Sequence, residues 1–170
     1  MDNEGSESRR PVAMAANSED SGRKVVPLRG AGIWAGSQSE LASELVYEMG
    51  IDSFFGASHA MRPNGARHTH SFRVQASFVT EELDTSGMTV GFREVSNLLD
   101  AEAKRFASKF LNEIEPFTMI EPTGENLASV IFRNLLTSLQ TTLPGGPKLI
   151  GVTLWENPTS YVRVGRQRAA

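Results

Sequence analysis

Within residues 70–80, apolar and polar residues alternate from Ser71 to Phe78, which predicts a β-strand with one buried face. The apolar positions of this strand are Phe72, Val74, Ala76 and Phe78. An earlier stretch, residues 45–47 and 51–61, is rich in β-branched and aromatic residues and predicts a preceding strand, interrupted around Gly50 and Gly56. The turn-forming residues 84–87 and the extended run at 88–92 predict a hairpin that continues past residue 81.

The hydrophobic period then changes to that of helices. Apolar residues at helical spacing predict a helix over roughly residues 93–110, and Pro116 prevents its continuation. Thr123 can cap a second helix, which Pro144–Pro147 ends. Two last strands follow at 148–155 and 160–164, joined by a turn. The order is therefore ββααββ, which is typical of an α+β domain.

The first part of the chain has no apolar period of either kind. Residues 1–28 are dominated by Ser, Glu, Asp, Asn, Gly and Arg, which predicts a disordered tail without chemistry of its own. We expect one domain over residues 29–170, with a Gly- and Ser-rich lead-in before its ordered part begins near Ser43. The low apolar share of the chain, 39%, fits a tail that dilutes the average.

Composition narrows the function classes. The net charge is −3 and no basic stripe is present, so nucleic acid is a poor partner. Cysteine is absent, which excludes disulfides, thiolate metal ligands and a cysteine nucleophile, and fits a cytoplasmic protein. No apolar run approaches about 18 residues, so we expect no membrane span. The N-terminus also lacks the apolar segment of a secretion signal.

The only three histidines of the chain gather around one predicted hairpin. His68 and His70 lie two residues apart, which places both on one face of a strand. His59 lies in the preceding strand, and an antiparallel return can bring it alongside them. Three neutral imidazoles and a water make an open, catalytic type of zinc site, whereas a structural site needs a fourth side chain. A His-x-His pair on a strand edge is also often ordinary surface, so the spacing alone leaves both interpretations open.

Six segments resemble, in the same order, the motifs of the 6-pyruvoyltetrahydropterin synthase and 6-carboxytetrahydropterin synthase family. Each motif is weak by itself, but the ordered set is specific and spans about residues 45–165. The segments are FFGASH at 54–59, HTHSF at 68–72, GMTVGF at 87–92, LN at 111–112, PTGENLA at 122–128 and VTLWENP at 152–158.

The resemblance implies the tunnelling fold, an antiparallel four-stranded sheet with two helices on one face. It also implies a homo-oligomer, a trimer closed into a barrel or a hexamer of two stacked barrels. Family members act on the side chain of 7,8-dihydroneopterin triphosphate. Zinc, held here by His59, His68 and His70, polarises the side-chain hydroxyls, while a cysteine and an Asp-His pair move protons.

The resemblance further implies substrate-binding residues. Glu156 matches the glutamate that anchors the pterin ring by accepting hydrogen bonds from its amino and ring N–H groups. Thr123 and Glu125 match the turn beside that pocket. A solvated turn carboxylate is the alternative for Glu156, and helix capping is the alternative for Thr123 and Glu125.

The chain departs from the family at every proton-moving position. The segment that should hold the cysteine reads RPNGA at residues 62–66, and the Asp-His pair falls on Ala107 and Ser108. Gly91 replaces the aspartate of the family's G-M-V-M-D-F segment. The first candidate for a replacement base is Glu113, because a glutamate has the most suitable pKa. Other candidates are Lys109, Ser108, Arg67 and Asn64.

Three functions are compatible with this pattern. The first is a zinc-dependent lyase of this family that acts on a pterin-like or other hydroxylated, phosphorylated small molecule, diverged from ordinary pterin synthesis. The alternative is a non-catalytic, zinc-containing oligomer that binds a small molecule. A structural oligomer with a vestigial metal is the weakest of the three, because three histidines together serve no packing need.

Overall fold

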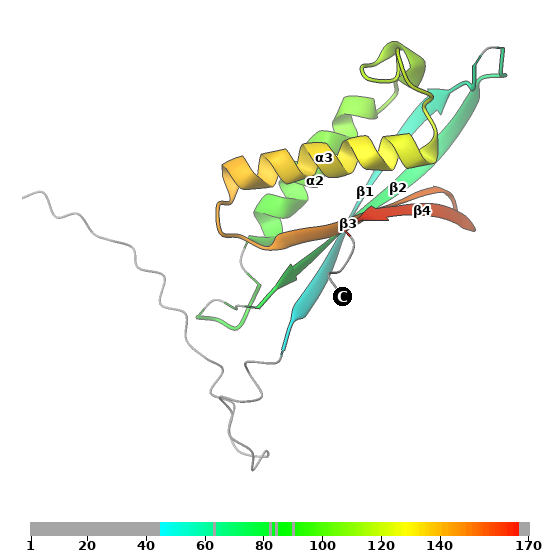
Figure 1. Ribbon diagram of the computed structural model, residues 1–170. Helices are drawn as coiled ribbons and strands as arrows, with labels where there is room; N and C mark the ends of the chain where they lie inside the picture. The colour runs from blue at the N-terminus through cyan, green and yellow to red at the C-terminus, as the bar shows by residue number, and fades with distance from the viewer. Residues whose placement is uncertain (1–44, 63, 82, 84, 90, 167–170) are drawn as a thin grey trace, which may run out of the picture.

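The computed structural model describes residues 45–62, 64–81, 83, 85–89 and 91–166. It forms two layers, a four-stranded antiparallel sheet and two helices that cover one of its faces (Figure 1). The strands, in sheet order, are β1 Tyr47–His59, β2 His68–Thr80, β3 Lys148–Asn157 and β4 Ser160–Gly165. The helices are α2 Phe92–Phe106, the 3₁₀ turn η1 Leu111–Glu113 and α3 Gly124–Thr142. The predicted α+β class and ββααββ order are confirmed.

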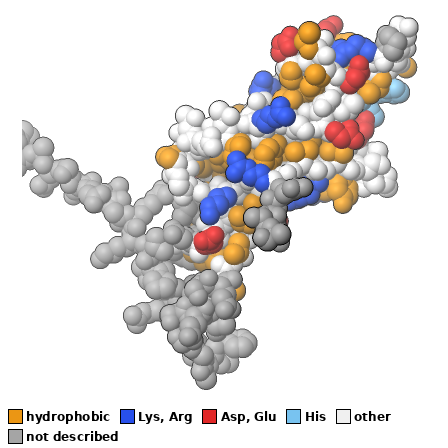
Figure 2. All heavy atoms as spheres, viewed as in Figure 1, with side chains coloured by type: hydrophobic (Ala, Val, Ile, Leu, Met, Phe, Trp, Pro, Cys, Tyr) orange, Lys and Arg blue, Asp and Glu red, His pale blue; other side chains and the backbone are white. Residues whose placement is uncertain are grey.

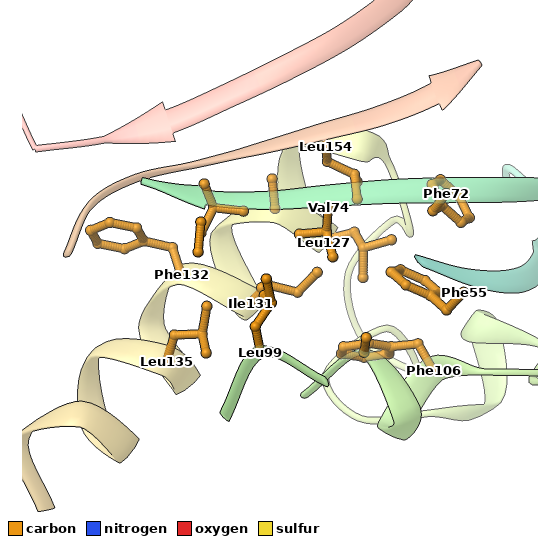
Figure 3. Packing of buried hydrophobic residues seen from close by; sticks show 14 of the residues in the cluster. Phe55, Phe72, Val74, Leu99, Phe106, Leu127, Ile131, Phe132, Leu135 and Leu154 are labelled. Carbon is orange, nitrogen blue, oxygen red and sulfur yellow. The ribbon is translucent and has the colours of Figure 1, made fainter. Parts of the chain in front are cut away.

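The core lies between the sheet and the helices. The alternation along β2 has the predicted effect, since Phe72, Val74, Ala76 and Phe78 are all buried. Phe55 of β1 stacks on Phe72, with ring centroids 5.2 Å apart. Figure 3 shows Phe55, Phe72 and Val74 of the sheet facing Phe106 of α2 and Leu127 of α3. Burial of this apolar surface fixes which face of each strand turns inward.

Two glycines do not interrupt the first strand, contrary to the sequence prediction. β1 runs unbroken from Tyr47 to His59, and Gly50 and Gly56 lie on its exposed side. Gly50 pairs with Ser77 and Gly56 with Ser71. The ladder to β2 therefore holds both glycines in the extended conformation despite their weak strand propensity.

The hairpin does not continue beyond residue 81 as an extended run at 88–92. Among the described residues, 85–87 form a turn, Met88 and Thr89 belong to no strand, and Phe92 already begins α2. Gly91 has φ of 81°, a left-handed conformation that glycine adopts freely. Its carbonyl accepts the first helical hydrogen bond, from the N–H of Val95. The helix start thus includes Gly91 and Phe92, the last two residues of the run that the pattern assigned to a strand.

The first helix is also shorter than predicted. It ends at Phe106 rather than near residue 110, because the chain turns at Ser108, which has φ of 60°. The N–H of Ser108 then donates to Gly56, and the N–H of Ser58 donates to Lys109. The free edge of β1 supplies these backbone partners, which a continuing helix would have lost.

The predicted tail of residues 1–28 and its lead-in lie outside the described residues. Among the described residues, no helix is both long enough and apolar enough to cross a membrane.

Candidate metal centre

The register of the first hairpin brings the three histidines together. His59 ends β1 and is paired directly with His68, the first residue of β2. His70 pairs with Ala57, so all three imidazoles start from the same face of the hairpin. The ring of His59 has its centroid 5.1 Å from that of His70 and 6.3 Å from that of His68. The rings of His68 and His70 are 6.2 Å apart. Histidine side chains reach the surface, where they are pale blue in Figure 2.

His59 is the most constrained of the three. It is buried, and its Nδ1 lies 2.7 Å from the carbonyl oxygen of Pro122. A carbonyl oxygen only accepts, so Nδ1 must carry the proton. The neutral ring then presents the lone pair of Nε2, which is the form that binds metal ions.

Glu156 joins the histidines from the end of β3. Its Oε1 lies 3.0 Å from Nε2 of His70 and 3.3 Å from Nε2 of His59. One donor atom from each of these three side chains lies within 4.8 Å of the others, a set that could hold a metal ion. His68 lies beside this set rather than within it. Two imidazoles and a carboxylate, with a third imidazole next to them, are ligands that zinc accepts, so the residues present fit the metal.

A network behind His59 fixes the segment that carries Pro122. The side chain of Arg62 donates from Nε to Glu121 and from its two Nη atoms to the carbonyls of Phe117 and Ile120. Its backbone N–H donates to Glu121 as well. This backbone hydrogen bond, together with the side-chain bond and the charge of Arg62, holds the pKa of Glu121 below its ordinary value.

The amide of Asn112 attaches η1 to the same region. Its Oδ1 accepts from the N–H of Ala60 at 2.9 Å, and its Nδ2 donates to the carbonyl of Ala60 at 2.7 Å. This double hydrogen bond gives Asn112 of the LN segment a structural role. The sequence analysis did not identify Arg62 or Asn112 as supports, because their partners are more than 50 residues away in sequence and leave no local pattern.

The residues expected beside the pocket have capping roles in the structure. Thr123 is the N-cap of α3, and its hydroxyl accepts from the N–H of Asn126 at 3.2 Å. Glu125 is exposed in the first helical turn, where a negative charge is favourable. The side chain of Asn126 donates to the carbonyl of Glu121, which fixes the Pro122 segment from its other side.

Among the described residues, no hydrogen bond or ion pair joins a candidate proton-moving residue to the histidines. Glu113 is exposed in η1, and among the described residues its carboxylate makes no hydrogen bond or ion pair. Arg67 donates to Oγ of Ser58 and lies over the ring of Phe110. Because Ser58 and His59 are neighbours on a strand, their side chains point to opposite faces. Arg67 therefore lies on the face opposite the imidazoles.

The family's remaining relay positions hold no proton-moving group in the structure. Ala107 packs against the core, and exposed Ser108 forms the turn after α2. Lys109 and Asn64 are exposed, and no contact among the described residues links their side chains to the imidazoles.

Fold and site together define an α+β domain of the tunnelling type with a candidate metal centre at the end of its first hairpin. The model of the 6-pyruvoyl tetrahydropterin synthase family matches residues 48–167. The chain therefore belongs to this family.

Individual relatives agree with this assignment. The chain is 29% identical over 124 residues to 6-carboxy-5,6,7,8-tetrahydropterin synthase of Bacillus subtilis, a match that covers 68% of this chain and 82% of that protein. The 6-pyruvoyl tetrahydropterin synthase of Caenorhabditis elegans superimposes with a TM-score of 0.61 at 17% identity, covering 72% of this chain and 97% of that one. The enzyme of Plasmodium vivax, in a form whose catalytic glutamate is replaced by alanine, gives a TM-score of 0.59 at 14% identity, covering 74% and 100%. At these identities the two structures show the fold alone.

Proposed function

We propose that the protein is a zinc-dependent, lyase-like enzyme that acts on a pterin-like or other hydroxylated small molecule and has diverged from ordinary pterin synthesis. The observation that carries the proposal is the convergence of His59, His70 and Glu156, with His68 alongside, in a chain of the pterin synthase family.

The three histidines would hold the zinc ion. Bound there, zinc would supply a Lewis acid that lowers the pKa of a substrate hydroxyl and stabilises negative charge on its oxygen. The Pro122 carbonyl keeps His59 in the tautomer with a free Nε2 lone pair. Glu156 would orient the substrate, because its carboxylate can accept two parallel hydrogen bonds from neighbouring N–H donors.

The divergence concerns the proton transfers. A cysteine is absent from the chain, and Ala107 and Ser108 stand where the family has its Asp-His pair. Glu113 is our candidate for the base, since η1 is held beside the histidine site by the pairing of Asn112 with Ala60.

A second function is favoured by the same missing residues. A zinc-containing protein that binds a pterin without converting it would need the histidines and Glu156 but no proton relay. The two functions differ in turnover, not in metal content or ligand binding.

The test is an assay of 7,8-dihydroneopterin triphosphate conversion beside the Bacillus subtilis relative, with zinc content measured on the same samples. General acid–base groups contribute factors of about 10²–10⁴. We therefore expect turnover at most about a hundredth of that of the relative, with one zinc per chain. Comparable turnover would refute the divergence.

Single variants distinguish residues that hold the metal from the residue that acts as the base. His68→Ala should remove most of the zinc, whereas Glu113→Gln should keep the zinc and lower any activity that the wild type has. Protein that is fully folded and free of zinc when purified with zinc present would refute the metal assignment. Full zinc with pterin binding but no turnover on any pterin would identify the second function.

A further inference from the structure

We propose that Glu156 is itself a metal ligand in the substrate-free protein and that substrate binding draws its carboxylate off the metal. The inference rests on the proposed function, because it concerns the same metal and the same substrate pocket. Glu156 would bind the metal when substrate is absent and the substrate when it is present. Its movement would free one metal position.

The orientation of His59 is the first argument. Its Nδ1 faces the carbonyl of Pro122 at 2.7 Å, so its Nε2 is the atom that faces the site. That nitrogen lies 3.3 Å from Oε1 of Glu156. In a neutral ring both atoms offer lone pairs, and one cation bound by both makes their contact attractive.

The distances suit a metal ion in that position. Zinc binds histidine nitrogen and carboxylate oxygen at about 2.0–2.2 Å, which places two ligand atoms of a tetrahedron roughly 3.4 Å apart. The carboxylate oxygen lies 3.0 Å and 3.3 Å from the two Nε2 atoms. These distances fit ligand atoms of one ion, without a large movement of the side chains.

Glu156 also completes the ligand count. With His68 it makes four protein side chains, and four-coordinate sites without a free position are typical of structural zinc. The fourth ligand of the resting site would thus be a carboxylate, whereas the sequence predicted an open site with three histidines and a water. Chemistry at such a site requires that one ligand leaves.

Glu156 is the ligand best able to leave. His59 and His70 are held by paired strands, and their side chains are 9% and 25% exposed. The side chain of Glu156 is 36% exposed and sits where the register between β3 and β4 shifts. Its longer, flexible side chain can turn toward solvent without moving the backbone.

Hydrogen bonds to a pterin-like substrate would favour dissociation of the Glu156 carboxylate from the metal. Its amino and ring N–H groups form a donor pair that matches a carboxylate. A substrate that takes the carboxylate of Glu156 also frees a metal position for its own hydroxyl. Release of the Glu156 carboxylate from the metal is thereby coupled to the binding of a molecule that has both the N–H donor pair and the hydroxyl.

The experiment uses full-length protein loaded with Co²⁺, whose visible absorption reports coordination number, and azide as a probe for a free metal position. Wild type, Glu156→Ala and the isosteric Glu156→Gln are compared with Glu94→Gln, a control that removes an exposed carboxylate from α2. Circular dichroism verifies the fold of each. Loss of a group that supports a metal typically lowers affinity about 10–100-fold. We expect both Glu156 variants to bind Co²⁺ at least about tenfold more weakly and azide at least about tenfold more tightly than wild type and the control.

The outcomes separate the inference from the function on which it rests. Equal Co²⁺ affinity, equal spectra and equal azide binding in wild type and the folded Glu156 variants would overturn the inference while leaving the histidine site intact. Wild type that binds no Co²⁺ would instead overturn the proposed function.

Discussion

Glu102 is a buried acid in the contact between the two helices. Its carboxylate accepts from Nη1 of Arg105 at 2.9 Å and from Nδ2 of Asn134 at 2.6 Å. Arg105 lies one turn further along α2, whereas Asn134 reaches across from α3. A buried carboxylate is stable only when such donors replace the water it has lost. Glu102 therefore contributes to helix pairing through its partners.

Removal of the partner from α3 should be costly. Asn134→Ala leaves one side of the buried Glu102 carboxylate without its donor, and hydrogen bonds to charged groups contribute about 1.5–3 kcal/mol. We expect the free energy of unfolding in urea to fall by about that amount. Gln140→Ala, an exposed change on the same helix, is the control and should have little effect. A loss below about 0.5 kcal/mol for Asn134→Ala would contradict the role of the hydrogen bond.

At the scale of elements, the segment between η1 and α3 supports the metal centre. Arg62 holds its carbonyls from one side, and Asn126 holds the carbonyl of Glu121 from the other. Pro122 lies between these two anchors and contacts His59. The orientation of the His59 ring in one strand is thus controlled by a loop about 60 residues later in the chain.

Arg62→Ala should weaken the metal centre without touching a ligand. The loop would lose three side-chain hydrogen bonds, and the Pro122 carbonyl would no longer be held against His59. Second-sphere changes of this type lower metal affinity about 10–100-fold. The measurement is a competition titration with a zinc chelator. Arg93→Ala, which removes an exposed charge from α2, should leave the affinity unchanged.

The ion pair of Arg62 and Glu121 predicts that the stability of the fold depends on pH. Arg62 holds the pKa of Glu121 below its ordinary value of 4.5, mainly through the backbone N–H. A carboxyl group whose pKa is lower in the folded state stabilises the fold at pH values above its unfolded-state pKa. This stabilisation is lost as the pH falls through the folded-state pKa. Arg62→Ala keeps this backbone N–H but removes the side-chain hydrogen bond and the charge, so the pKa of Glu121 should rise only part of the way towards its ordinary value, as measured by NMR titration of its carboxyl carbon. An unchanged value in a folded variant would exclude the side-chain contribution.

At the scale of the whole molecule, one sheet face has no helical cover within the described residues (Figure 1). Phe54 of β1 and Tyr161 of β4 are 70% and 63% exposed on that face. Beside them, Trp155 contacts both Tyr161 and the guanidinium of Arg73. The outer edge of β4 is also unpaired among the described residues. Open edges and exposed aromatic side chains favour self-association.

We therefore predict a homo-oligomer, a trimer or hexamer as the family resemblance implies. Light scattering at micromolar concentration should give three or six chain masses. Phe54→Asp places a charge on the open sheet face and should shift the mass toward the monomer. Met119→Asp, a change at an apolar residue 83% exposed but outside the sheet, is the control. A wild-type monomer would refute the prediction.

Residues 1–28 are predicted to be dispensable for both the metal and the assembly. Their sequence has no apolar pattern that could be buried against the domain. Deletion of these residues should leave zinc content and oligomer mass unchanged. A drop in either would assign the tail a structural role.

Periodicity by itself determined the elements and their order. The alternation at Phe72–Phe78 and the helical spacing after Val95 are local consequences of which face is buried, and they led to the correct class. The spacing of His68 and His70 likewise placed them on one face. Boundaries were less predictable, because Gly91 begins a helix and Ser108 ends one for reasons that depend on distant backbone partners.

Only the tertiary structure decided how the site is assembled. The pairing of β2 with β3 brings Glu156 to the histidines, across more than 80 residues of sequence. The contact of Pro122 with His59 and the support from Arg62 span about 60 residues. Local sequence patterns do not predict such contacts, because hydrogen bonds between distant segments depend on strand register and helix packing. The sequence alone therefore identified the chemical groups, whereas the fold determined which of them meet.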